Sequence, residues 1–157
     1  MNEHDLKADI PDSRQLRVDW RQWLALNAVV SKSPPAGEPC RVTVVVTTEL
    51  PHDHPQLATL LDADRVVIEI ETFTDGRVFG LARLLRDELG FDGDLEVSGD
   101  FLPDQISFLR RCGVNAFSGE DIVRDAFNYY SGFYQPPRAG IDEVTFIRES
   151  RAGPEND

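Results

Sequence analysis

The sequence is poor in cysteine, and its two cysteines form no recognisable motif. Cys40 and Cys112 stand far apart, without a CxxC or Cys/His spacing. A zinc site or a haem-attachment motif is therefore not supported. We expect both residues to be reduced thiols of a cytosolic protein, and Cys112 to belong to the core, because free cysteine is among the most buried residue types.

Long apolar runs are also lacking. None approaches the ~20 residues that a membrane-spanning helix needs, and short runs such as 66–68 are interrupted by charged residues. Residues 1–5 are polar and acidic, unlike the basic and then apolar start of a secretory signal. We therefore predict no contact with membranes and a cytoplasmic location.

Positive charge is in short supply. The chain has 16 basic and 28 acidic residues, so its net charge is −12. A field of this sign repels nucleic-acid phosphates and anionic lipids, which argues against both as partners. The charge is explained either by solubility alone or by the docking of a basic partner protein.

Several motifs of known chemistry are missing. The sequence contains no GxGxxG, GxxxxGK[ST], GxSxG or HExxH pattern. Signatures for flavin, nicotinamide, haem or iron–sulfur binding are absent too, so we predict no cofactor. His52 and His54 flank Asp53 between two prolines, and we interpret this segment as an exposed loop rather than a metal site.

The residues that are present predict one α/β domain. A length of 157 residues and 41% hydrophobic residues suit a single globular unit. We expect a domain over 14–147, with flexible ends at 1–13 and 148–157. Hydrophobic periodicity predicts strands at 41–48, 65–71, 95–99, 114–117 and 144–147. It predicts helices at 20–28, 56–61, 77–89, 103–112 and 120–130.

Strands that alternate with helices indicate a mainly parallel sheet. An open doubly wound sheet and a partial barrel are both compatible with this pattern. In either, functional sites lie beyond the carboxyl ends of the strands. Here that edge carries residues 72–77 and 99–105, two loops that we expect to be neighbours in space.

The first of these loops suggests an anion site. Arg77 stands at a helix start, where free N–H groups and a forked guanidinium suit sulfate, sulfite, phosphate or carboxylate. In the alternative interpretation, Asp75 caps this helix and Arg77 pairs with an acidic neighbour. Gly76 separates the two residues.

Further candidates follow along the chain. Arg83 and Arg86 share a helical face, and Arg83 can reach Asp87, which indicates a solvated, salt-bridged face. Asp104 and Gln105 start the next helix, either as a cap with a surface amide or with Asp104 as a general base or ligand-orienting group. Catalytic residues stay unknown. The candidate ligand-binding residues are Asp75, Gly76, Arg77, Arg83, Asp104 and Gln105.

A combined pattern in the second half of the chain resembles a known bacterial family. It comprises residues 73–77, 79, 82–86, 89–90, 93–95, 99–100, 104–105, 109–113, 116–117 and 134–135. The family that it resembles is domain-of-unknown-function family 934. Its members are commonly described as probable oxidoreductases of sulfite reduction and are encoded beside sulfate-assimilation enzymes.

The resemblance implies an accessory or partner protein in assimilatory sulfate or sulfite reduction. Its partner would be sulfite reductase or another sulfate-assimilation enzyme. The alternative is a small domain or enzyme that acts on a sulfur oxyanion or phosphorylated ligand through Arg77. The family has no established catalytic residues, so none is carried over. This chain has Thr72, Glu96 and Pro103 where members usually or often carry cations, which weakens the anion-site hypothesis.

Overall fold

The fold is a parallel α/β sheet, as the sequence predicts. In the computed structural model, the described residues are 15–29, 40–118 and 145–147. They include a six-stranded sheet in which every neighbouring pair of strands is parallel. The strands follow one another in chain order across the sheet: β1 (Gln15–Asp19), β2 (Arg41–Thr47), β3 (Arg65–Ile70), β4 (Asp94–Gly99), β5 (Ala116–Ser118) and β6 (Thr145–Ile147).

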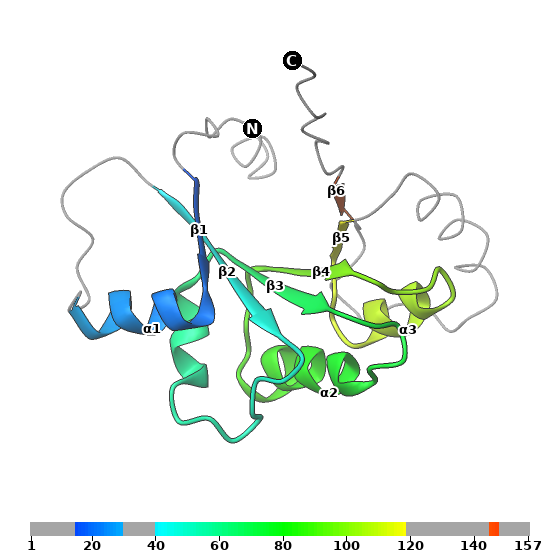
Figure 1. The fold of residues 1–157 in the computed structure, drawn as a ribbon, viewed down its shortest axis with the longest axis horizontal. Helices are drawn as coiled ribbons and strands as arrows, with labels where there is room; N and C mark the ends of the chain where they lie inside the picture. The colour runs from blue at the N-terminus through cyan, green and yellow to red at the C-terminus, as the bar shows by residue number, and fades with distance from the viewer. Residues whose placement is uncertain (1–14, 30–39, 119–144, 148–157) are drawn as a thin grey trace, which may run out of the picture.

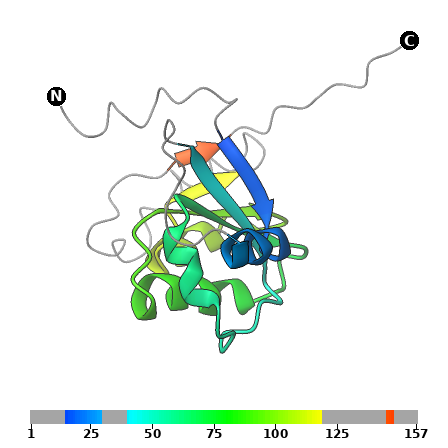
Figure 2. The same ribbon diagram turned by 90° about the vertical axis from the view of Figure 1, so that its left-hand side faces the viewer.

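The described helices gather on one side of this sheet (Figures 1 and 2). They are α1 (Trp20–Val29), the 3₁₀ helix η3 (Leu57–Asp62), α2 (Arg77–Arg83), the π-helical turn η4 (Leu84–Glu88) and α3 (Gln105–Arg111). The sheet is open, and its strand order lacks the reversal that defines a doubly wound sheet. None of the described helices is long and apolar enough to span a membrane.

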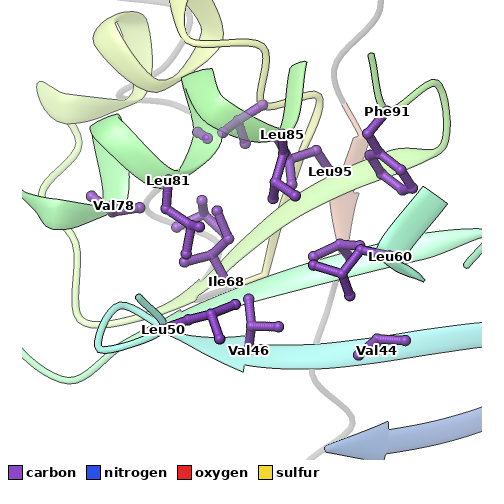
Figure 3. Close-up of a cluster of buried hydrophobic side chains, with 14 of the residues drawn as sticks. Val44, Val46, Leu50, Leu60, Ile68, Val78, Leu81, Leu85, Phe91 and Leu95 are labelled. Atoms are coloured by element: carbon purple, nitrogen blue, oxygen red, sulfur yellow. The ribbon is translucent and has the colours of Figure 1, made fainter. Parts of the chain in front are cut away.

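One core joins the helices to the sheet. Alternate residues of the central strands, such as Val46 and Ile68, face the helices, and the α2–η4 stripe of Val78, Leu81 and Leu85 packs onto them (Figure 3). Val46, Ile68, Leu81 and Leu85 are all fully buried. This packing fixes where each strand ends, and thereby where the strand-end loops lie.

Glu96 lies on the opposite face of the sheet. Its neighbours Leu95 and Val97 belong to the core, so strand alternation turns Glu96 away from the helices. Glu96 is buried, and its carboxylate accepts a hydrogen bond from Arg65 Nη1 at 3.2 Å. The position is within β4 rather than in a strand-end loop.

β1 is a strand that the sequence analysis missed. β1 precedes α1 directly and pairs with β2. Asp19 is the N-cap residue of α1, since Gln22 N donates to Asp19 Oδ1 at 2.8 Å and Asp19 N donates to Gln22 Oε1 at 3.0 Å. This reciprocal pair is a capping box, which fixes the turn from strand to helix.

Other boundaries differ slightly from the prediction. Pro103 precedes α3 by a turn instead of opening the helix. Gly90 and Gly113 end their helices with φ of 74° and 102°, as expected for glycine at these places. The predicted helix at 120–130 and the predicted flexible ends at 1–13 and 148–157 lie outside the described residues.

Arg86 is not on a solvated face, contrary to the prediction. Its Nε donates to Gly113 O at 2.8 Å, and its Nη1 donates to Phe91 O at 2.5 Å and Gly93 O at 2.8 Å. Its Nη2 donates to Asn115 Oδ1 at 3.1 Å. The half-buried guanidinium therefore ties η4 to the segments that precede β4 and β5.

Candidate functional site

The loops that follow β3 and β4 lie side by side next to α3, as predicted (Figure 1). Asp100 N donates to Ile70 O at 3.0 Å, and Phe73 N donates to Asp100 Oδ2 at 3.2 Å. Gly99 makes this approach possible, because a Cβ on it would lie 2.1 Å from Ile70 O. The two loops therefore form one continuous rim at the carboxyl end of the sheet.

Gln105 holds the two loops together. Its Nε2 donates to Phe73 O at 2.9 Å, and its Oε1 accepts from Leu102 N at 2.8 Å. The predicted surface amide is partly exposed, and both of its polar atoms are bonded to backbone. Gln105 acts as a clamp between the β3 loop and the β4 loop.

Asp75 and Arg77 form a two-pronged ion pair. Arg77 Nε lies 2.9 Å from Asp75 Oδ1, and Arg77 Nη2 lies 2.8 Å from Asp75 Oδ2. Asp75 also accepts from the backbone N of Arg77 at 3.1 Å and from Thr48 Oγ1 at 2.5 Å. The Arg77 side chain is 56% exposed and that of Asp75 is 14% exposed.

These bonds shift the proton affinity of both groups. The Arg77 side chain, helped by the Thr48 hydroxyl, holds the pKa of Asp75 far below its ordinary range. The hydrogen bond to Asp75 raises the pKa of Arg77. Both groups are therefore charged at any physiological pH and neutralise each other. Of the two interpretations offered above, the structure shows the one in which Asp75 bonds the helix start and Arg77 pairs with an acidic neighbour.

The remaining candidates make fewer contacts. Gly76 is the N-cap residue of α2 and contributes no side chain. Asp104 is the exposed N-cap residue of α3, but its carboxylate makes no capping hydrogen bond. Asp75, Gly76, Arg77, Asp104 and Gln105 thus all lie in the rim.

Arg83 lies elsewhere. Its Nε is 3.5 Å from Asp87 Oδ2, which confirms the predicted salt-bridged face, and its side chain is 69% exposed. It lines an open groove of about 540 Å³ on the outer side of α2 and η4. The groove residues are His52, Asp53, Gly80, Arg83, Leu84, Asp87 and Glu88. None of them belongs to the rim, so Arg83 is separated from the other candidates.

The segment at 52–54 has local contacts. The ring of His54 meets Trp20 edge-on at 5.3 Å, and its Nδ1 accepts from Gln56 N at 3.2 Å. His52 packs against Gly80. Within residues 15–29, 40–118 and 145–147, no three His, Cys, Asp or Glu side chains are grouped to hold a metal ion.

The two cysteines are free in this structure. Cys112 packs against the core, as predicted, while Cys40 is exposed. Burial raises the pKa of the Cys112 thiol, which lowers its thiolate fraction.

Exposed apolar side chains at the rim were missed by the sequence analysis. Phe73 is 43% exposed and Leu102 is 39% exposed, and the Gln105 amide holds the backbone of both. Phe108 follows on α3 at 45% exposed, with the Arg111 guanidinium 4.3 Å from its ring centre. The available signal was a large apolar residue in each strand-end loop, where polar residues are usual.

The sequence matches one known family over most of its length. The model of a family described as bacterial protein of unknown function (DUF934) matches residues 46–144. The chain belongs to this family. The DUF934 match begins in β2 and includes the whole rim, whereas β1 and α1 precede it. No curated protein and no solved structure matches the chain significantly.

Proposed function

We propose that this DUF934 protein is an accessory protein of assimilatory sulfate or sulfite reduction, which binds sulfite reductase or another enzyme of that process. The pathway is what the family resemblance implies. One observation favours a binding role over catalysis. The Arg77 guanidinium is already paired with the Asp75 carboxylate, with two hydrogen bonds of 2.9 and 2.8 Å.

An oxyanion ligand at Arg77 would be repelled by the ionised carboxylate of Asp75. Asp75 stays ionised because its pKa is strongly lowered, and it occupies the face of the guanidinium that a sulfite or sulfate would use. The ligand would have to displace this carboxylate and also break the Thr48 bond to it. Polar groups that are satisfied within the protein suit a rigid surface better than a site for a small anion.

The charge of the chain also suits protein binding. A net charge of −12 gives a field that draws a basic surface towards it and repels nucleic acid and sulfur oxyanions alike. Such steering raises association rates at low ionic strength and weakens as salt is added.

Co-purification with sulfite reductase from the same source tests this proposal. We expect a complex on size-exclusion chromatography at low salt that dissociates as ionic strength rises. An unrelated folded protein of similar size and net charge serves as a negative control for charge alone. Failure to associate at low salt would count against the proposal.

A thermal-shift screen tests the alternative hypothesis, in which the protein binds a sulfur oxyanion or phosphorylated ligand through Arg77. Sulfite, sulfate, phosphate, nucleotides and adenylyl sulfate are added to the wild type and to Arg77→Ala. We expect no compound-specific shift in melting temperature for either protein. A shift with one sulfur oxyanion that disappears in a folded Arg77→Ala variant would establish the oxyanion site instead.

A further inference from the structure

We propose that the protein docks its partner through the strand-end rim, defined as residues 71–77 and 99–105, and that the partner presents a basic segment carrying an apolar side chain. This inference rests on the proposed function for the identity of the partner protein. The surface itself and the chemistry that it recognises follow from the rim alone.

The rim presents two apolar anchors on a fixed backbone. The backbone of Phe73 is bonded on both sides, to Asp100 through its N–H and to Gln105 through its carbonyl. Leu102 N donates to Gln105, and Leu102 O accepts from Gln105 N at 3.0 Å. Two large apolar side chains are thus held outward, with every one of these backbone groups already satisfied.

The loop beneath Leu102 is anchored in the core. Phe101 is 8% exposed, and its ring centre lies 5.8 Å from that of the fully buried Phe117. Adjacent residues of the same loop therefore point in opposite directions, one inward and one outward. A surface fixed in this way loses little conformational entropy on binding, which favours affinity.

The charges around the anchors define the partner. The rim carries four carboxylates and one guanidinium, which leaves it with a net charge of −3. Arg77 is neutralised by Asp75, so Glu71, Asp100 and Asp104 set the field, and all three are exposed. An aromatic anchor within an acidic border fits a partner segment with lysine or arginine on either side of an apolar residue.

The same charges disfavour two other occupants. A second copy of the chain would bring an identical surface with a net charge of −3 against this one, and like charges at an interface repel. A small anion would meet the same repulsion. A basic protein segment is the occupant that both the apolar and the charged groups accept.

The test uses a designed probe, a basic amphipathic peptide of alternating lysine and leucine, with a glutamate–leucine peptide as its matched control. Amide chemical shifts of the labelled full-length protein are followed during titration. We expect the basic peptide to shift residues 71–77 and 99–105 first and the acidic peptide to shift none of them. Equal effects from both peptides, no binding, or shifts spread evenly over the molecule would overturn the inference.

Matched variants test the apolar anchors. Leu102→Ser and Phe73→Ser together should weaken peptide binding about tenfold or more, since buried anchors dominate interface affinity. Leu61→Ser is the control, because Leu61 is 44% exposed on η3, outside the rim. Equal weakening by Leu61→Ser, or none by the rim variants, would contradict the inference.

A charge variant tests the acidic border. Asp104→Lys is suitable because the carboxylate makes no capping bond, and Glu88→Lys in the groove is its control. We expect Asp104→Lys to weaken binding and flatten its salt dependence more than Glu88→Lys does. Identical behaviour of the two variants would show a general charge effect and refute a specific rim.

The outcomes separate this inference from the proposed function. If sulfite reductase binds the wild type and the Phe73→Ser/Leu102→Ser variant equally well, the rim is refuted and the function stands. If the basic peptide binds the rim but sulfite reductase does not bind at all, the rim stands and the function is refuted. Self-association of the wild type that the rim variant abolishes would assign the surface to a second copy and overturn the inference.

Discussion

Replacement of Arg86 by alanine should destabilise the domain much more than replacement of the nearby Arg83. The guanidinium donates to the carbonyls of Phe91, Gly93 and Gly113 and to the Asn115 amide oxygen. Each carbonyl left without a donor costs roughly 1–3 kcal/mol when water cannot reach it. Because the site is half-buried, water can replace some of the lost hydrogen bonds. We expect Arg86→Ala to lower the free energy of unfolding by about 3–5 kcal/mol in total.

A neighbouring arginine provides the control. Arg83 lies on the same helical segment, is 69% exposed and pairs with Asp87 at 3.5 Å. Arg83→Ala should cost about 0–0.5 kcal/mol. Arg86→Lys keeps the positive charge but lacks the several donors of the guanidinium. Its loss of stability should therefore fall between those of Arg86→Ala and Arg83→Ala.

Urea unfolding measures these differences. Fluorescence of Trp20 and Trp23 and far-ultraviolet circular dichroism follow the unfolding transition. The dependence of the unfolding free energy on urea concentration is compared between wild type and variants, to verify that unfolding exposes the same surface area in each. Since a domain of this kind is stable by about 5–15 kcal/mol, Arg86→Ala should lose a large share of the total. A loss within about 0.5 kcal/mol of that for Arg83→Ala would refute the structural role of Arg86.

Three further predictions concern single positions. Gly113→Ala should lower the melting temperature more than Gly90→Ala, because a Cβ at 113 would lie 2.2 Å from Arg86 Cγ whereas that at 90 meets nothing within 4 Å; equal losses would contradict this. Gln105→Ala should speed hydrogen exchange of the Leu102 amide, which it bonds at 2.8 Å, while Gln56→Ala should not. Asp75→Asn should be less stable than the wild type at neutral pH, and this difference in the free energy of unfolding should become smaller in acid.

The sign of the Asp75 effect follows from its pKa. The pKa is lowered from an ordinary value of 3.8, so ionised Asp75 stabilises the folded state above about that pH. The contribution is lost as pH falls from there through the folded pKa. Urea midpoints of the wild type and Asp75→Asn at neutral and acidic pH measure the gap. A gap that is constant or that widens in acid would contradict the ion pair.

The sheet was predictable because its strands carry a direct signal. The β-branched run of β2 and the alternation with helices predicted parallel pairing, and parallel pairing predicted that the loops after β3 and β4 would meet. β1 was missed because Leu16 and Val18 give too short an apolar pattern before the α1 signal begins. Its assignment depends on pairing with β2, which only the folded chain provides.

The roles of Arg86 and Gln105 could not be predicted from local spacing. The separation of Arg83 and Arg86 predicts a shared solvent face, but the π-helical turn that begins at Leu84 changes the helical register. Two of the groups that Arg86 binds, Gly113 O and Asn115 Oδ1, lie 27 and 29 positions later in the chain. Gln105 likewise bonds Phe73, 32 positions earlier in the chain.

The most direct test of the central claim is the affinity of the purified protein for sulfite reductase at low and raised ionic strength, measured alongside the Phe73→Ser/Leu102→Ser and Leu61→Ser variants. The account predicts saturable binding by the wild type and by Leu61→Ser that weakens with salt, and a large loss of affinity in the rim variant. Absence of binding by the folded wild type at low ionic strength would contradict it.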